Sequence, residues 1–247
     1  MWPQLVLVHA FPLGPRMWDE LITHLPSTVN VSAPALPGFA GTPVSTAPAD
    51  LEIFAQALLD QVDGTFVIGG CSMGGYVAME LMRRAPERLA GMILMDTKAD
   101  ADGDAARTRR HEVAAGVESE GVAQWVDALT APLLGATTRR ENPALVQRVR
   151  ELVLATDPAA IAWAQRAMAA RPDSRDTLAA WQKPALVLVG AEDELSPVEV
   201  AAAMVELLPE GELVVIPNAG HLAAWERPKP VAAAISRWWA TAFPLAE

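Results

Sequence analysis

The chain has 247 residues, of which 51% are hydrophobic and 20% are charged, so it is long enough to form one large globular domain with a sizeable core. The formal net charge of -11 argues against nucleic acid and anionic membranes as partners, because both would repel this surface. Cys71 is the single cysteine, which excludes an intramolecular disulfide and favours a reducing compartment, most simply the cytoplasm.

The N-terminal stretch MWPQLVLVHAFPLG is expected to be a strand and not a targeting signal. It is apolar, but it lacks a basic region, contains two prolines and ends without a small-residue cleavage pattern. Nowhere does the sequence reach the roughly eighteen uninterrupted apolar residues that a membrane span requires. We therefore expect a soluble protein with no membrane partner.

Short apolar runs bounded by Gly, Pro or Asp alternate with helical patterns along the chain. In chain order the expected elements are a strand at 4–10, a helix at 16–25, a strand at 29–34, a helix at 50–62, a strand at 65–70, a helix at 73–84, strands at 91–96 and 185–190, a helix at 197–207, a strand at 212–217 and a helix at 228–240. This alternation predicts the α/β class, with a mainly parallel sheet covered by helices on both faces.

Residues 97–182 interrupt this rhythm, because they contain helical patterns and no strand-like run. The interval begins after the strand at 91–96 and ends before the strand at 185–190. Ligands of open α/β sheets bind at the carboxyl ends of the strands, so this insertion is expected to cover a site there. The expected division is a core of residues 1–96 and 183–247 and a helical cap, or lid, of residues 97–182.

The stretch VIGGCSMGG places Ser72 in a G-x-S-x-G motif that directly follows an expected strand and precedes an expected helix. In this context a serine serves as a nucleophile on a strained turn, where side chains at Gly70 and Gly74 would crowd the strand and the helix. The helix start adds unpaired N–H groups beside the oxygen that becomes negative. The alternative is a glycine-rich turn with an incidental serine, which the partners below disfavour.

A serine hydroxyl needs a general base, and four histidines are candidates. His24 lies in a helical pattern and His111 in the charged stretch RTRRHEV, so both are interpreted as solvated. His9 ends the first strand and is a candidate structural residue near the site. His221 follows a strand and a glycine-bearing loop, C-terminal to Ser72, and this position suits the base.

The base in turn needs an orienting acid. Asp193 lies just past a buried strand and gives the chain order Ser72, Asp193, His221, which is the hydrolase order and not either of the two protease orders. Asp96 also ends a strand and competes for the role, and Glu192 is a weaker competitor. Acids after strands are also frequent helix caps, so this choice stays open between Asp193 and Asp96.

Four stretches, VHAFPLG, GGCSMGG, GAEDELSP and NAGHLAAWERP, in this order and spacing, resemble the α/β-hydrolase superfamily over nearly the whole chain, especially its small bacterial esterases and lactonases. The stretch RAMAARPDS at 166–174 is similar to stretches of 3-oxoadipate enol-lactonase-like hydrolases. The resemblance implies a lactone or small carboxylic ester as substrate. It also implies an oxyanion hole made by the backbone N–H groups of Phe11 and Met73.

The chain departs from this family at several points. Ala10 stands where glycine is usual after the histidine, and Cys71 stands where histidine is common. Only eight residues precede His9, which leaves no room for the antiparallel hairpin that usually opens this fold. We therefore expect about six strands, all parallel. A sheet edge then needs to be covered, shortened or paired with a second copy, and a homodimer through this edge is a hypothesis.

The implied reaction is acyl transfer, with Ser72 as nucleophile, His221 as base and Asp193 as orienting acid, and with no metal or organic cofactor. Arg166 and Arg171 are candidates to meet a substrate carboxylate. Besides Phe11 and Met73, the candidate substrate walls are Leu13, Trp125, Leu133, Leu134, Trp163, Leu195 and Leu222. Ordinary core packing is an equal alternative for each of these walls.

Two further readings remain beside ester hydrolysis. The same three residues support cofactor-free perhydrolysis of the haloperoxidase type, C–C bond cleavage or hydroxynitrile lyase chemistry, because cap and pocket residues set function on a shared fold. Outside enzymes, the chain could be a ligand-binding relative without turnover. The complete set of Ser72, Asp193 and His221 argues against that last reading.

Overall fold

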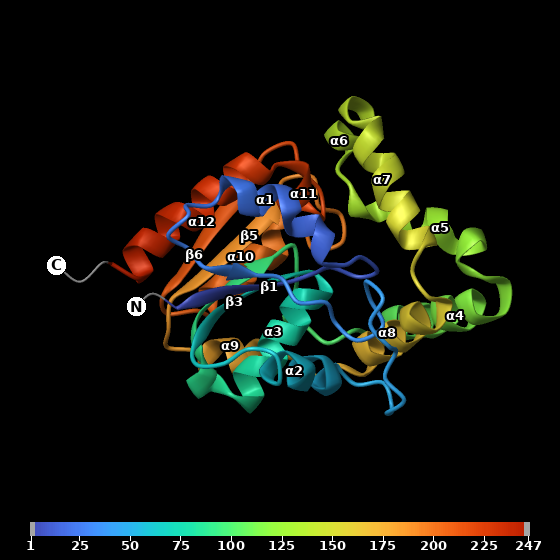
Figure 1. Ribbon diagram of the computed structural model, residues 1–247, viewed down its shortest axis with the longest axis horizontal. Coiled ribbons are helices and arrows are strands. Elements are labelled where there is room, and N and C mark those ends of the chain that lie inside the picture. The colour runs from blue at the N-terminus through green and yellow to red at the C-terminus, as the bar shows by residue number, and fades with distance from the viewer. Residues whose placement is uncertain (1–2, 245–247) are drawn as a thin grey trace.

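A computed structural model describes residues 3–244 of the chain. Its centre is one six-stranded sheet in which every neighbouring pair is parallel (Figure 1). The strands, in the order in which they lie across the sheet, are β2 (Val31–Ser32), β1 (Gln4–Val8), β3 (Phe66–Cys71), β4 (Leu89–Met95), β5 (Ala185–Gly190) and β6 (Gly211–Ile216). The prediction of six parallel strands is confirmed.

The strands are apolar on both faces because helices cover both faces. Successive side chains of a strand point to opposite sides, and in β1 Leu5 and Leu7 join one hydrophobic cluster while Val6 and Val8 join another. The first cluster packs under α1 (Asp19–His24), α11 (Ala223–Glu226) and α12 (Pro228–Ala242), and the second under α2 (Leu51–Leu59), α3 (Met73–Arg84) and α10 (Val198–Glu206) (Figure 1). This is the layered α/β architecture that the sequence predicts.

Residues 97–182 are helical in the structure. They form α4 (Asp104–Glu120), α5 (Val122–Thr130), α6 (Ala136–Glu141), α7 (Pro143–Leu154), α8 (Pro158–Ala170) and α9 (Arg175–Ala179). Their boundaries follow from local chemistry: Gly121 has φ 83° between α4 and α5, and the Asn142 and Asp157 side chains cap α7 and α8. In Figure 1, α4 to α8 stand beyond the carboxyl ends of the strands, and α4 packs along α8.

The two edges of the sheet differ. The expected strand at 29–34 is reduced to Val31–Ser32, so one edge is short, whereas β6 at the other edge keeps six residues and exposes Val215. Short edge strands protect a sheet from pairing with other chains. The edge beside β1, to which the homodimer hypothesis refers, is thus a shortened one, and the homodimer stays a prediction. None of the helices within residues 3–244 is long and apolar enough to cross a membrane.

Candidate active site

Ser72 lies on a strained turn between β3 and α3. Its backbone has φ 53° and ψ -113°, a left-handed conformation that side-chain-bearing residues rarely adopt. The flanking glycines permit this turn: a Cβ at Gly70 would lie 2.1 Å from the carbonyl oxygen of Gly74, and a Cβ at Gly74 would lie 2.2 Å from that of Val8. Both glycines are therefore required by close backbone contact, as the motif predicts.

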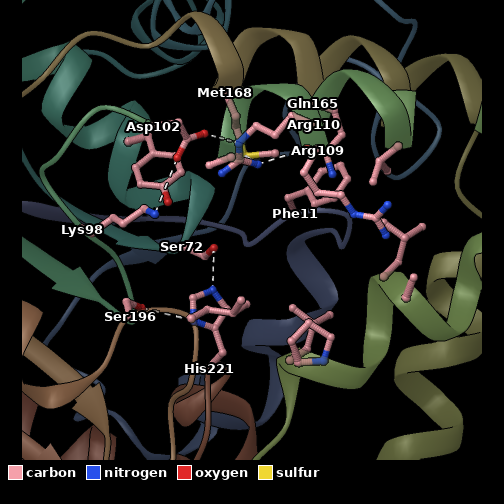
Figure 2. A pocket seen from close by; sticks show the side chains of 18 residues that line it. Phe11, Ser72, Lys98, Asp102, Arg109, Arg110, Gln165, Met168, Ser196 and His221 are labelled. Atoms are coloured by element: carbon pink, nitrogen blue, oxygen red, sulfur yellow. Dashed lines mark hydrogen bonds and ion pairs between the residues drawn. The ribbon is translucent and has the colours of Figure 1, made fainter. Parts of the chain in front are cut away.

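Three side chains form a hydrogen-bonded line that begins at this turn. His221 Nε2 lies 2.8 Å from Ser72 Oγ, and His221 Nδ1 lies 2.8 Å from Asp193 Oδ2. A proton on Nδ1, donated to the carboxylate, leaves Nε2 free to accept the hydroxyl proton of Ser72. The structure thus brings together the nucleophile, base and acid that the sequence proposes (Figure 2 shows Ser72 and His221).

Asp193 is held as a carboxylate. Burial by itself raises its pKa, but the hydrogen bonds and charge interaction with His221 and the hydrogen bonds from Ser196 outweigh burial, so the pKa lies below its usual value. Ser196 donates from its hydroxyl to Oδ2 at 2.7 Å and from its backbone N–H to Oδ1 at 3.1 Å, and the Leu195 N–H donates to Oδ1 at 2.8 Å. An ionised, fixed Asp193 suits the orienting role.

Asp96, the competing acid, is directed elsewhere. Its carboxylate accepts from the backbone N–H of Gly190 at 2.8 Å and of Ala223 at 2.9 Å, and it makes no hydrogen bond to the His221 ring among the described residues. Complete burial, followed by the charge of Asp193, raises its pKa well above the usual range. Asp96 therefore ties the ends of β4 and β5 to the histidine loop, and Asp193 is the acid that contacts His221.

Two backbone N–H groups at the site have no acceptor within the described part of the chain. These are Phe11, in the loop after β1, and Met73, at the first position of α3. The first N–H groups of a helix lack intrahelical partners, so Met73 is free to donate to an anion. Ala10 stands where glycine is usual in similar sequences. It is fully buried, and its N–H lies 3.2 Å from the sulfur of Met17.

A cavity of about 390 Å³ opens between core and cap at Ser72 (Figure 2). This volume suits a small organic ligand. Of the predicted walls, Phe11, Leu133 and Leu195 line it, together with Ser72 and His221. The remaining lining residues are Tyr76, Lys98, Asp102, Ala106, Arg109, Arg110, Val113, Ala128, Leu129, Pro132, Gln165, Met168 and Ser196.

The other predicted substrate walls lie outside this cavity. Trp163 packs against Phe54 with ring centroids 4.9 Å apart, and its indole N–H donates to a core carbonyl. The indole N–H of Trp125 donates to Glu120 at 3.0 Å, and the Arg109 guanidinium lies 5.2 Å from its ring centroid. The buried residues Met73, Leu13, Leu134 and Leu222 belong to the hydrophobic clusters and are not among the lining residues. At these positions the structure shows ordinary core packing, which was the alternative to substrate contact.

The two arginines singled out for a substrate carboxylate are also placed elsewhere. Arg166 forms two hydrogen bonds with Glu118 on the cap surface, and Arg171 is buried against Asp102 with its guanidinium 4.1 Å from the Tyr76 ring centroid. Instead Lys98, Arg109 and Arg110 reach the cavity. Sequence reasoning missed these three. One usable signal was the position of Lys98, two residues after the end of a strand, where α/β sites form.

The other histidines have no contact with the Ser72 hydroxyl. Burial lowers the pKa of His9 to about 4, so its ring is neutral, and its Nε2 accepts from the Leu36 N–H at 3.3 Å. His24 and His111 are exposed, as expected. His9 is therefore the structural residue that its position at the end of the first strand suggests.

The cap rests directly on the histidine loop. Glu226 accepts from the N–H groups of Gly220 at 2.8 Å and of Gly135, at the start of α6, at 2.9 Å. Glu192, the weaker acid candidate, accepts from Thr137 instead. A Cβ on Gly135 would lie 2.7 Å from the Gly220 nitrogen. One buried carboxylate thus joins cap and core next to His221.

Several known proteins are similar to this chain. The profile of the Alpha/beta hydrolase family matches residues 5–234. A pimeloyl-[acyl-carrier protein] methyl ester esterase of Aromatoleum aromaticum is 31% identical, with 94% of this chain and 96% of the relative aligned. A thermophilic esterase of Thermogutta terrifontis, solved with malate bound, superposes with a TM-score of 0.92 at 37% identity, covering 98% of this chain and 91% of the esterase.

A second solved structure shares the fold. The enol-lactonase of Burkholderia xenovorans superposes with a TM-score of 0.89 at 20% identity, covering 97% of this chain and 92% of the lactonase. At that identity the likeness concerns the fold alone.

Proposed function

Because the chain belongs to the alpha/beta hydrolase family, we propose that it is a serine hydrolase that cleaves a small carboxylic ester or lactone through an acyl-enzyme on Ser72. The observation that carries this proposal is the unbroken hydrogen-bonded line from Ser72 through His221 to Asp193 at the wall of a cavity. Relatives named as esterases support a hydrolase, and the cavity volume suits a small substrate.

In the first half of the reaction, Ser72 Oγ attacks the substrate carbonyl while His221 Nε2 takes its proton. Asp193 holds the imidazole and stabilises its positive charge. The N–H groups of Phe11 and Met73 donate to the carbonyl oxygen as it becomes negative. His221 then protonates the leaving alcohol, which leaves an acyl group on Ser72.

In the second half, His221 takes a proton from a water molecule, which attacks the acyl carbonyl and releases the acid. We propose that residues 97–182 act as a cap in both halves. They supply most of the cavity wall opposite Ser72, and they exclude bulk water from the charges that develop there.

Hydrolysis of p-nitrophenyl esters of increasing acyl length, by the native protein and by Ser72→Ala, tests the proposal. Methyl esters belong in the same panel, because several relatives are named for a methyl ester. We expect turnover of short esters by the native protein and a loss of at least a thousandfold in the variant. Equal turnover by both proteins excludes Ser72 as the nucleophile.

Covalent labelling with a fluorophosphonate provides a second readout. Ser196 is the other serine of the cavity wall, so it is the matched internal control. Peptide mass spectrometry should place the label on Ser72 in the native protein and should find no label in Ser72→Ala. A label on Ser196 contradicts the assignment.

A further inference from the structure

The cap side of the cavity carries an excess of positive charge, although the chain as a whole has a net charge of -11. Three cations line this cavity, Lys98, Arg109 and Arg110, against one carboxylate, Asp102. Arg109 is partly neutralised by Glu112 at 3.2 Å on the exposed side of α4. In the view of Figure 2, Lys98, Asp102 and Arg110 lie on one side of Ser72 and His221 lies on the other.

Asp102 already accepts hydrogen bonds from two arginines. Its side chain is fully buried, and its oxygens accept from Arg171 at 2.8 Å and from Nε of Arg110. Lys98 lies 3.5 Å away. One carboxylate, that of Asp102, therefore contacts three cations, Lys98, Arg110 and Arg171. Unbalanced charge in a partly buried cavity attracts a counter-charge more strongly than it would in water.

Lys98 and Arg110 each keep a donor for a ligand. The Lys98 ammonium has no hydrogen bond within residues 3–244, and its side chain is 29% exposed. Arg110 uses Nε on Asp102 and Nη1 on Gln165 at 3.0 Å, which leaves Nη2 without a partner in the described chain. Both side chains form part of the cavity wall. Two donors on two neighbouring cations match the two oxygens of a carboxylate.

We propose that Lys98 and Arg110 form an anion-binding subsite that receives a carboxylate at the end of the substrate remote from the bond that Ser72 attacks. The preferred substrates are then half-esters of short dicarboxylic acids, or lactones that carry a carboxylate. This inference rests on the proposed function and specifies its substrate class. Asp102 holds the two cations in place, and Gln165 fixes the Arg110 fork.

The competing explanation is that the cluster only fastens the segment after β4 to α4 and α8. A purely structural ion cluster would affect stability and would treat charged and neutral substrates alike. The ratio of kcat/KM for an anionic ester to that for a neutral ester of equal length separates the two explanations. Monomethyl glutarate and methyl valerate form such a pair, because each has a five-carbon acyl chain.

The experiment measures this ratio for the native protein, for Lys98→Met and for Arg166→Met. Arg166→Met is the matched control, because it removes a cap cation that is paired with Glu118 outside the cavity. We expect the native protein to favour monomethyl glutarate, and the ratio to fall about tenfold or more in Lys98→Met, as expected for one lost charge-assisted hydrogen bond. Arg166→Met should keep the native ratio, and Lys98→Arg should restore much of it.

An equal ratio in the native protein, Lys98→Met and Arg166→Met overturns the subsite. The proposed function survives that result as long as methyl valerate is hydrolysed by the native protein and not by Ser72→Ala. If the native protein hydrolyses neither ester, the result counts against the proposed function instead.

A binding measurement tests the subsite without turnover. Calorimetric titration of glutarate into Ser72→Ala should show binding. The affinity should be about tenfold weaker in the double variant that carries both Ser72→Ala and Lys98→Met. It should also weaken as salt is raised, since salt screens the ionic contacts. Absence of glutarate binding, or equal affinity in both proteins, overturns the subsite. Lys98→Gln replaces Lys98→Met if the methionine variant does not fold.

Discussion

At the scale of single residues, the two buried aspartates near His221 have pKa values that are shifted in opposite directions. Burial raises the pKa of Asp193, but the interactions with His221 and Ser196 lower it by more. For Asp96, burial and the charge of Asp193 both raise the pKa. The environment thereby shifts the pKa values of two acids that contact one loop in opposite directions, although both are buried.

Replacement of each aspartate by asparagine tests this separation. Asp193→Asn should lower kcat by about a thousandfold or more, because the amide favours the wrong imidazole tautomer. Asp96→Asn should lower kcat far less, by about tenfold at most, since the Asp96 side chain bonds backbone N–H groups and does not contact the ring. Steady-state kinetics on a short ester measures both, and a larger loss in Asp96→Asn reverses the assignment.

Asp102 should make stability depend on acid pH. Burial alone raises its pKa, but Arg171 and Arg110 outweigh burial and hold the pKa well below its usual range. A carboxyl group with a depressed folded-state pKa stabilises the protein above its unfolded pKa of about 4, and this contribution is lost as the pH falls towards the folded pKa. Native stability should therefore decline below about pH 4, and Asp102→Asn should decline less.

Urea unfolding of the native protein and Asp102→Asn measures this effect. At pH 7 the variant should lose about 3 kcal/mol or more, because the buried guanidinium of Arg171 is left without its counter-charge. Glu118→Gln, which breaks an exposed pair with Arg166, is the control and should lose less than about 1 kcal/mol. If the free energies of unfolding of the native protein and Asp102→Asn fall in parallel as the pH is lowered, the pKa of Asp102 does not control the acid stability.

At the scale of elements, the contact between the start of α6 and the histidine loop should couple the cap to the chemistry. Gly135→Ala inserts a methyl group 2.7 Å from the Gly220 nitrogen and 2.6 Å from Glu192 Oε2. We expect a loss of about 1–3 kcal/mol in stability, or a displaced His221 and a lower kcat.

Gly103→Ala is the matched control for Gly135→Ala. Gly103 precedes α4 with a similar extended backbone, and a Cβ there has nothing within 4 Å. In thermal unfolding, the stability of Gly103→Ala should match that of the native protein within about 0.5 kcal/mol. Its kcat should equal the native value. Equal behaviour of the two alanine variants would show that cap and histidine loop are not coupled.

The strands of the core were predictable because burial on both faces leaves a continuous apolar run that Gly, Pro and Asp interrupt sharply. The strand at 185–190 agrees with β5 at both ends. The helical nature of 97–182 was equally visible. The cavity wall was not, because helical periodicity reveals that a residue such as Trp163 is buried but not which neighbour buries it. Likewise, RTRRHEV is charged whether Arg110 faces water or a cavity.

At the scale of the whole molecule, both hydrophobic clusters extend from the sheet into the cap. The cluster under α12 includes Val117 and Val149, and the cluster under α3 includes Trp163 and Met168. Cap and core therefore complete each other's burial.

We therefore expect the chain to unfold in a single cooperative transition. In scanning calorimetry, the calorimetric and van't Hoff enthalpies should agree, and a peptide of residues 97–182 alone should show little helical circular dichroism. Two resolved transitions, or a folded isolated cap, would contradict this. Ser72→Ala serves as the control and should unfold with the same cooperativity.

The insertion of 97–182 between the adjacent strands β4 and β5 also has a consequence for evolution. Ser72, Asp193 and His221 follow core strands, whereas Lys98, Arg109 and Arg110 belong to the inserted segment. Under the proposed function, mutations that change the preferred acid or length of a substrate can accumulate in the insertion while the three proposed catalytic residues remain unchanged. A lineage with this arrangement can change its substrate preference and keep the same reaction.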